Sequence, residues 1–188
     1  MRISLRFKII IAVLLVISFF GTLATVLVFN YTKSTLIEKE KNTLEVLSNQ
    51  TGDKVDQIFN QSLMVVKSIA QEEFSKSALK DSADEDEFSE ALVHLHHYNV
   101  NGMYSSLYII NNYGDTIIST DPSFVGKNYS FRNYFQDAIN NKSSVDVAVG
   151  VTSNEMGYYF SHPITSQTGE IIGVAATPII SPVWEVIG

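Results

Sequence analysis

Residues 145–152 read Val-Asp-Val-Ala-Val-Gly-Val-Thr, so every second residue is a valine and the residues between are small or polar. Side chains of a β-strand point to opposite faces in turn, and the pattern predicts a strand with two unlike faces. The valine face must pack on something, most simply on a long helix. The other face carries Asp146, Ala148, Gly150 and Thr152. We interpret it as the floor of a ligand pocket, with a solvent-facing strand surface as the alternative.

Four more strands are expected around this one, because short runs rich in β-branched and aromatic residues recur between turn signals. They occupy residues 106–110, 116–119, 158–163 and 171–177. The segment Asn-Asn-Tyr-Gly-Asp at 111–115 is a hairpin signal, and further turns are expected at 153–157 and 166–169. The sequence therefore predicts a five-stranded antiparallel sheet.

Two shorter helices are expected to flank the sheet. Residues 131–139 have apolar side chains at helical spacing, and Ser130 can cap this helix. An acidic run at 81–87 starts a second helix over residues 83–97, with Ser82 and Glu85 in capping-box spacing. The fold class is therefore α+β.

A long amphipathic helix is predicted ahead of the sheet. Residues 31–77 contain no proline and one glycine, Gly52, and their apolar side chains recur at intervals built from three and four. These residues are Leu36, Leu44, Leu47, Val55, Ile58, Met64, Val65 and Ile69. The helix could pair with a second copy of itself in a homodimer, or serve as a mere stalk.

Residues 9–29 read IIIAVLLVISFFGTLATVLVF and carry no charge. A helix of this length is about 31 Å long, which matches a bilayer core of about 30 Å. Arg2, Arg6 and Lys8 precede it, so the positive-inside rule places residues 1–8 in the cytoplasm, a transmembrane helix at 9–30 and the rest outside. The alternative is a cleavable signal peptide, although residues 29–31 make a poor cleavage site.

Composition excludes several classes of function. The 188 residues have a net charge of −7 and no cysteine. A general nucleic-acid binder, a disulfide framework, a thiolate metal site and a cysteine nucleophile are therefore excluded. His94 and His97 lie one helical turn apart near Glu90, a spacing that suits a metal but is more typical of a solvated histidine cluster. We expect no metal and no cofactor.

Known enzyme motifs are absent from the sequence. Ser161 and His162 are neighbours in a predicted strand, point to opposite faces and cannot form a nucleophile–base pair. A hydrolase that uses Asp121, Asp146 or His162 remains a distant alternative. We expect a protein that is not an enzyme.

Arg132 is the candidate ligand-binding cation. It lies in the first turn of the helix predicted after Ser130, where backbone N–H groups and a guanidinium both favour an anion. The alternative is a surface arginine paired with a local acid. Tyr129, Thr152 and either Tyr158 or Tyr159 could add hydroxyl groups.

Four segments carry a family resemblance: Gly-Lys-Asn-Tyr-Ser-Phe-Arg-Asn-Tyr-Phe-Gln-Asp-Ala at 126–138, Val-Gly-Val-Thr-Ser at 149–153, Gly-Tyr-Tyr at 157–159 and Gly-Glu-Ile-Ile-Gly-Val at 169–174. They resemble Cache (PDC-type, PAS-like) sensor domains, most closely the periplasmic sensor of four-carbon dicarboxylate transport histidine kinases. The resemblance covers residues 31–184 and implies that the long helix packs on one face of the sheet. The ligand would then bind between the other face and the segment around Arg132.

Position by position, the resemblance implies that Arg132 binds a ligand carboxylate. Its hydrogen-bonding companions would be Tyr129, Ser130, Thr152 and Tyr159. A lysine that dicarboxylate sensors carry on the last strand is missing, because Ala176, Thr177 and Pro178 occupy that region. A monocarboxylate, an amino acid or another small anion therefore stays open beside a dicarboxylate.

The resemblance also implies a role in signal transduction. We expect a periplasmic helix over residues 31–80 and a PAS-like ligand-binding domain over 81–188, with no output domain in this chain. A fragment, a truncated product and an orphan input module all fit. The expected function is a single-pass sensor in the bacterial inner membrane, of the two-component histidine kinase type, which binds a small organic anion outside the cytoplasm and signals through its N-terminal helix. The alternative is a ligand-free dimerisation module of a diguanylate cyclase or chemotaxis receptor.

Overall fold

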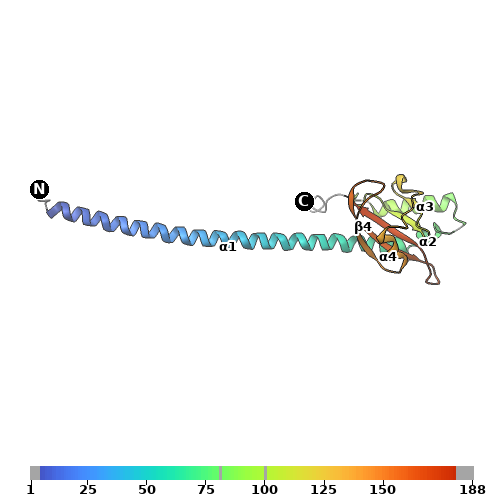
Figure 1. The fold of residues 1–188 in the computed structure, drawn as a ribbon, viewed down its shortest axis with the longest axis horizontal. Helices are drawn as coiled ribbons and strands as arrows, with labels where there is room; N and C mark the ends of the chain where they lie inside the picture. The colour runs from blue at the N-terminus through green and yellow to red at the C-terminus, as the bar shows by residue number, and fades with distance from the viewer. Residues whose placement is uncertain (1–4, 81, 100, 181–188) are drawn as a thin grey trace. The chain divides into compact units, whose positions relative to one another are not determined.

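The structure is a computed structural model that describes residues 5–80, 82–99 and 101–180. The chain divides into two compact units, Met1–Gly52 and Asp53–Gly188. Helix α1 (Leu5–Gln71) is coloured blue to green in Figure 1 and confirms the expected long helix. Within the described residues, no helix combines the length and the apolar character needed to cross a bilayer. The membrane segment at residues 9–30 stays a prediction.

The last turns of α1 are packed into the second unit, where Ser62, Val66, Ile69 and Ala70 are buried. The helix ends at Gln71, and a short helix α2 (Glu73–Ser77) follows. The hydroxyl of Ser75 donates a hydrogen bond of 2.5 Å to the carbonyl of Ile69, which ties α2 to the end of α1.

Helix α3 (Glu85–Tyr98) confirms the helix expected over residues 83–97, but its cap differs. The Asp84 carboxylate accepts from the backbone N–H of Glu87, and the Glu87 side chain accepts from the N–H of Asp84. The expected pair of Ser82 and Glu85 is therefore wrong. The acidic run offers two overlapping capping boxes, and aspartate is at least as good a cap as serine.

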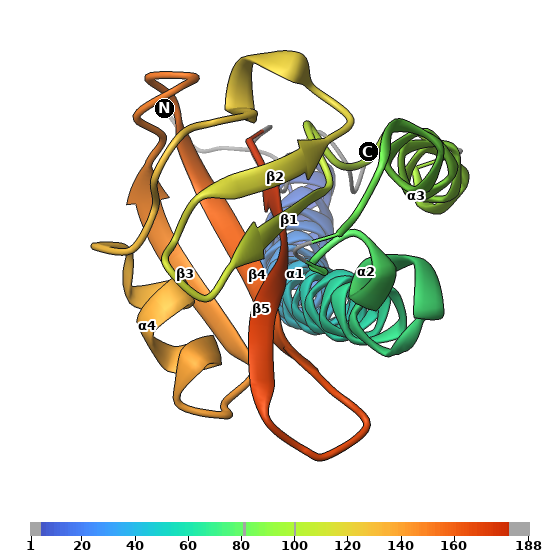
Figure 2. The same ribbon diagram turned by 90° about the vertical axis from the view of Figure 1, so that its right-hand side faces the viewer.

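The five-stranded antiparallel sheet is confirmed, with the strand order β2-β1-β5-β4-β3. The strands are β1 (Tyr108–Asn111), β2 (Thr116–Ser119), β3 (Ser144–Val149), β4 (Met156–Thr165) and β5 (Ile171–Ile179). A 3₁₀ turn η1 (Pro122–Phe124) and helix α4 (Asn133–Ile139) lie between β2 and β3. Figure 2 shows α4 on one side of the sheet, and α2, α3 and the last turns of α1 on the other.

Each face of the sheet has its own hydrophobic core. On the α1 face, Phe160 and Ile164 of β4 pack with Val66, Ile69 and residues of α3. On the α4 face, the core is largely aromatic and contains Tyr108, Phe124, Tyr129, Tyr134, Phe135 and Tyr159. Strand β4 contributes to both cores because its successive side chains point to opposite faces.

The valines of β3 face the side on which they were expected, but they are not covered. Val145 is paired with Phe160 and Val147 with Tyr158, and the rings of Phe160 and Tyr158 contact Phe59 of α1. Val147 nevertheless keeps 56% of its surface exposed. The prediction that this face packs on the long helix is wrong, because β3 is the edge strand and α1 covers its neighbour β4.

Truncation of the buried Phe160 and of the exposed Val147 should lower the free energy of unfolding by very different amounts. We expect Phe160→Ala to lower the free energy of unfolding by about 3–5 kcal/mol, since Phe160 is fully buried. Val147→Ala, on the same side of the sheet, should cost about 0.5 kcal/mol or less. Urea unfolding of the full chain measures both, and equal costs would contradict this assignment of the core.

Candidate ligand-binding site

The segment that carries the candidate site is fixed by a close approach between two loops. The backbone of Gly114, in the β1–β2 turn, lies so near Ser130 that a Cβ there would come within 2.6 Å of the Ser130 Cβ. Gly114 also has a φ of +94°, which glycine adopts without strain. Its carbonyl accepts from the N–H of Tyr129 at 2.7 Å. The turn therefore positions the chain just before Arg132.

Helix α4 starts later than the sequence predicts. It begins at Asn133, and Arg132 is its N-cap residue with no capping hydrogen bond from its side chain. The Ser130 hydroxyl instead donates to the Asn128 side-chain carbonyl at 2.6 Å, and that oxygen also accepts from the Ser130 N–H. Ser130 is thus not the cap, and Arg132 is not in the first turn. The local turn made by Asn128 competes successfully for the hydroxyl.

Arg132 extends from α4 to the end of β3. Its Nη2 donates to the carbonyl of Val149 at 2.6 Å. Its guanidinium lies 5.2 Å from the ring centroid of Phe131 and 5.9 Å from that of Tyr159. Its Nε is buried and has no hydrogen-bond partner among the described residues. No carboxylate in the described part of the chain forms an ion pair with it.

Two tyrosines and a threonine complete the group. The hydroxyls of Tyr129 and Thr152 lie 2.6 Å apart. Thr152 belongs to the β3–β4 turn and not to the strand, because β3 already ends at Val149. Tyr159 is the tyrosine that faces this side, since its ring stacks on α4 while Tyr158 packs toward α1. A Cβ on Gly150 would overlap the hydroxyls of Ser153 and Tyr159, so a larger residue there would displace these side chains.

The structure therefore brings together four of the five predicted site residues: Arg132, Tyr129, Thr152 and Tyr159. Arg132 acts electrostatically on both tyrosines, where it opposes the rise in pKa that burial causes. Ser130 does not join them, because its hydroxyl is bonded to Asn128.

A pair of tyrosines that no sequence pattern indicated lies beneath this group. The ring of Tyr134 stacks on that of Tyr159 with centroids 5.3 Å apart, and the hydroxyls of Tyr134 and Tyr108 lie 3.0 Å apart. From its spacing in residues 131–139, Tyr134 is expected only on the apolar face of a helix. Ala148, on the small-residue face of β3, packs against this aromatic cluster. Aromatic rings therefore cover part of that face, and its role as the floor of a ligand pocket stays a prediction.

Other candidate groups are engaged elsewhere. The His94 ring stacks on Phe74 at 5.0 Å, and its Nε2 lies 3.8 Å from Glu90. Among the residues that the structure describes, no three His, Cys, Asp or Glu side chains form a metal site. The hydroxyl of Ser161 donates to the carbonyl of Tyr134 at 2.7 Å, whereas His162 is hydrogen-bonded to Ser143. Ser161 and His162 thus face opposite sides, as predicted.

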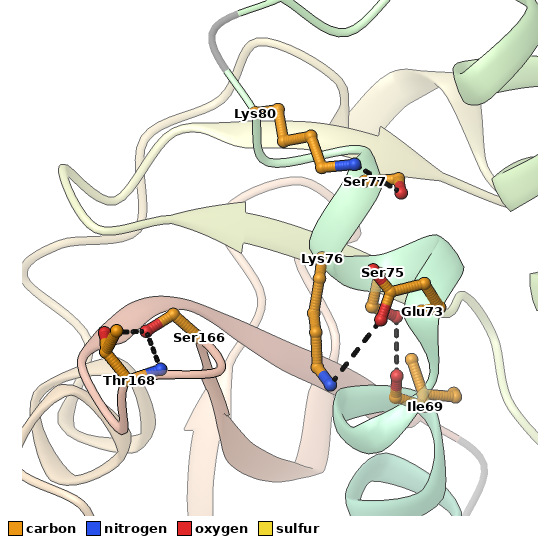
Figure 3. Close-up of polar contacts among 8 residues, drawn as sticks. All are labelled: Ile69, Glu73, Ser75, Lys76, Ser77, Lys80, Ser166 and Thr168. Carbon is orange, nitrogen blue, oxygen red and sulfur yellow. Dashed lines mark hydrogen bonds and ion pairs between the residues drawn. The ribbon is translucent and has the colours of Figure 1, made fainter.

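A groove of about 420 Å³ lies between α2 and the β4–β5 turn, away from the α4 face. Figure 3 shows that Lys76, Lys80 and Ser166, which line it, each have a polar partner. Lys76 is 3.9 Å from Glu73, Lys80 donates to Ser77, and Ser166 is hydrogen-bonded within its own turn. The group around Arg132 is therefore the better candidate site.

The buried tyrosines give stability a dependence on alkaline pH. Burial raises the pKa of Tyr108 and Tyr134 above the usual value of about 10. Above pH 10 the unfolded chain therefore releases these protons while the folded chain retains them, and stability falls as pH rises. We expect each of the two tyrosines to contribute up to about 1.4 kcal/mol per pH unit.

The double variant Tyr108→Phe/Tyr134→Phe tests this dependence. Its free energy of unfolding should fall less steeply with pH than that of wild type between about pH 10 and 11.5, where tyrosine ionises. Equal slopes for the two proteins would contradict the burial of these two hydroxyls.

No protein-family model matches the chain, and no curated protein matches it. Several solved structures match the chain. The sensor domain of the V. cholerae histidine kinase DctB is 24% identical, with a TM-score of 0.66 over 73% of this chain and 55% of that one. The E. coli DcuS sensor domain is 14% identical, with a TM-score of 0.58, and the match covers 71% of this chain and 95% of that one. The sensory domain of the Campylobacter jejuni chemoreceptor Tlp3, with isoleucine bound, is 19% identical, with a TM-score of 0.60, and the match covers 80% of this chain and 63% of that one. The chain thus spans about half the length of the DctB domain, and it has the fold of Cache (PDC-type, PAS-like) sensor domains.

Proposed function

We propose that this chain is the extracytoplasmic ligand-sensing domain of a bacterial signal-transduction receptor, and that it binds a small organic anion through Arg132. The observation that carries the proposal is the state of the guanidinium. It is half-buried, its Nη2 donates to the Val149 carbonyl, and among the described residues it has no ion-pair partner and its Nε has no acceptor.

An unpaired donor of this kind is costly. A buried polar group without a hydrogen-bond partner costs about 1–3 kcal/mol, and more when it is charged. A ligand carboxylate would supply both the missing acceptor and the missing negative charge, in the paired geometry that a guanidinium favours. Tyr129, Thr152 and Tyr159 offer hydroxyls beside it. Ser130 is the least supported of the proposed contacts, because Asn128 already uses its hydroxyl.

The sheet offers a route from the ligand to the long helix. Tyr159 and Phe160 are neighbours in β4 and point to opposite faces. Tyr159 lies beneath Arg132, whereas the Phe160 ring contacts Phe59 of α1 at 5.4 Å. A ligand that favours one position of Tyr159 would therefore bias α1, by no more free energy than its difference in affinity for the two states.

The remaining parts of the proposal rest on the sequence. The apolar run at residues 9–30 would anchor the chain in the inner membrane, with the basic residues 1–8 inside and the sensor outside. A histidine kinase would then read the signal, although a chemoreceptor has the same sensor fold. The chain would form a homodimer in this arrangement.

Removal of the guanidinium tests the proposed function. We expect Arg132→Ala to weaken the binding of small carboxylates by at least about tenfold, because a charge-assisted hydrogen bond contributes about 1.5–3 kcal/mol. Arg132→Lys should bind with intermediate affinity, since it keeps the charge and loses the fork. Calorimetric titration of the full chain with butanoate and butanedioate measures both effects.

The matched control is Lys127→Ala, which removes an exposed cation from the same loop and should leave the affinity unchanged. Equal affinities of wild type and Arg132→Ala for every carboxylate that binds would overturn the site. Equal losses in Arg132→Ala and Lys127→Ala would show that only the overall charge matters.

A second candidate function, a ligand-free dimerisation module, is favoured by the exposed valines of β3 and of the turn that follows it. Val145, Val147, Val149 and Val151 have exposed fractions between 38% and 62%, and we call them the valine strip. The strip contains no charged residue. A second copy is the partner that it suits, because valine would be buried on valine without bringing together the like charges of a chain with a net charge of −7.

Substitution within the valine strip tests this second function. We expect Val147→Asp to raise the concentration at which a dimer of the full chain half-dissociates by at least about tenfold, since it puts a charge into an apolar contact. Analytical ultracentrifugation measures it, with Val93→Asp on the exposed side of α3 as the control. A wild-type chain that is monomeric at all concentrations would rule the dimer out.

A further inference from the structure

His162 lies on the α1 side of β4, on the opposite face of the sheet from the candidate site. Side chains alternate along a strand, so His162 faces the same side as Phe160 and Ile164, which belong to the core of that side. Its ring is half-buried, and its Nδ1 lies 2.7 Å from the hydroxyl oxygen of Ser143. This hydrogen bond holds the ring between β4 and the turn that joins α4 to β3.

The charged group that acts electrostatically on His162 is Lys67 of α1. Lys67 follows the buried Val66, in the part of α1 that packs on the sheet. Neither His162 nor Lys67 forms an ion pair with a carboxylate of the described residues, and Glu73 and Lys76 of α2 are paired with each other. A proton on His162 would therefore place a second positive charge beside Lys67 with no ion-pair partner for either.

The other elements around His162 supply no compensating charge. On β5, the residue opposite His162 is Ala175. In the turn between α4 and β3, Lys142 is exposed and is a further cation. The Asp137 carboxylate of α4 accepts a hydrogen bond from Ser144, on the other face of the sheet. The surroundings of the ring thus favour its neutral form.

We propose that His162 makes the packing of α1 on β4 sensitive to acid: the packing is stable while His162 is neutral, and repulsion from Lys67 weakens it when His162 takes up a proton. The proton does not release the ring from Ser143, because a hydroxyl can accept from a protonated ring as well as donate to a neutral one. The added charge therefore stays on the α1 side, and the last turns of α1 shift relative to the sheet. This device is separate from Arg132, so it does not depend on the proposed ligand.

The direction of the pH dependence follows from the environment of the ring. Burial lowers the pKa of His162 most, and Lys67 lowers it further. The unfolded chain, in which a histidine has a pKa of about 6.5, therefore takes up this proton at a higher pH than the folded chain does. The contribution of neutral His162 to stability is complete above about pH 6.5, and it is lost as the pH falls from there through the pKa of the folded state.

Spin labels on the full chain test the proposal, because the sequence contains no cysteine that would take up a label elsewhere. Met64→Cys places one label on the exposed side of α1, and Thr168→Cys places the other in the turn between β4 and β5. The labelled chain is diluted with unlabelled chain, so that only distances within one chain are measured. We expect the mean distance to change by about 1–2 Å between about pH 7.5 and about pH 5, which is the size of a helix shift at an interface. His162→Gln and Lys67→Gln should each keep the same distance at both pH values.

Urea unfolding at the same two pH values is the second measurement. Acidification should raise the unfolding equilibrium constant of wild type about twofold to fivefold more than that of His162→Gln, the range for a partly exposed pair of charges. Lys67→Gln should show part of this reduction, since the burial of the ring remains. Lys67 is exposed, so this variant keeps the test decisive even where His162→Gln fails to fold.

The matched control is Lys142→Gln, which removes an exposed cation from the turn beside Ser143 and should keep the distance change of wild type. His94→Gln removes a histidine from α3 and should keep it as well. The same distance at both pH values in wild type overturns the proposal, and so does an equal change in wild type and His162→Gln. Loss of the change in Lys142→Gln as well as in Lys67→Gln would assign it to net charge, which also overturns the proposal.

Discussion

The pairing of β4 with β3 on one side and β5 on the other is the constraint on which the rest of the structure depends. It fixes the register in which Phe160 faces α1 and Tyr159 faces α4, so one strand serves both hydrophobic cores. The same register places Asp146 opposite Tyr159 and Val147 opposite Tyr158. A shift of one residue would exchange these faces, and it would move Asp146 to the side of α1 and the valines of β3 to the side of α4. The apolar pattern of the strands therefore determines where the charged groups of the site can be.

Elements with a strong local pattern could be predicted from the sequence. The alternation at residues 145–152 gave the two faces of β3, and β-branched runs gave the other strands. Burial could not be predicted for Val147, because exposure depends on which strand forms the edge of the sheet, and the order β2-β1-β5-β4-β3 is set by long-range pairing. The caps at Asp84 and Arg132 were missed for a local reason. At α3, Asp84 takes the capping role for which Ser82 also had the right spacing, and before α4 the Ser130 hydroxyl is bonded to the Asn128 side chain and not to the helix.

Some residues of the candidate site could also be predicted from the sequence, and others could not. Arg132, Tyr129 and Thr152 were predicted to lie together, and they do, although Thr152 reaches Tyr129 from a turn and not from the strand. Tyr134 and Tyr108 were missed because each looks like an ordinary core residue. Only the fold stacks Tyr134 on Tyr159 and brings its hydroxyl to Tyr108. Their contact is a buried hydrogen bond between residues 26 positions apart, a distance at which a sequence pattern carries no information about pairing.

Arg132 links two elements of the fold through its guanidinium. One nitrogen of its guanidinium is bonded to the Val149 carbonyl at the end of β3, and its Nε has no partner among the described residues. The guanidinium therefore already links the loop before α4 to the edge strand. A carboxylate that binds the remaining nitrogens would not need to reorganise this link, and a preorganised cation loses less conformational entropy on binding. Because β3 is paired with β4 and β4 contacts α1 through Phe160, a ligand that strengthens or weakens the link acts on the one strand that both faces share. The edge position of β3, which leaves Val147 uncovered, thus also leaves its end accessible to the residue that would bind the ligand.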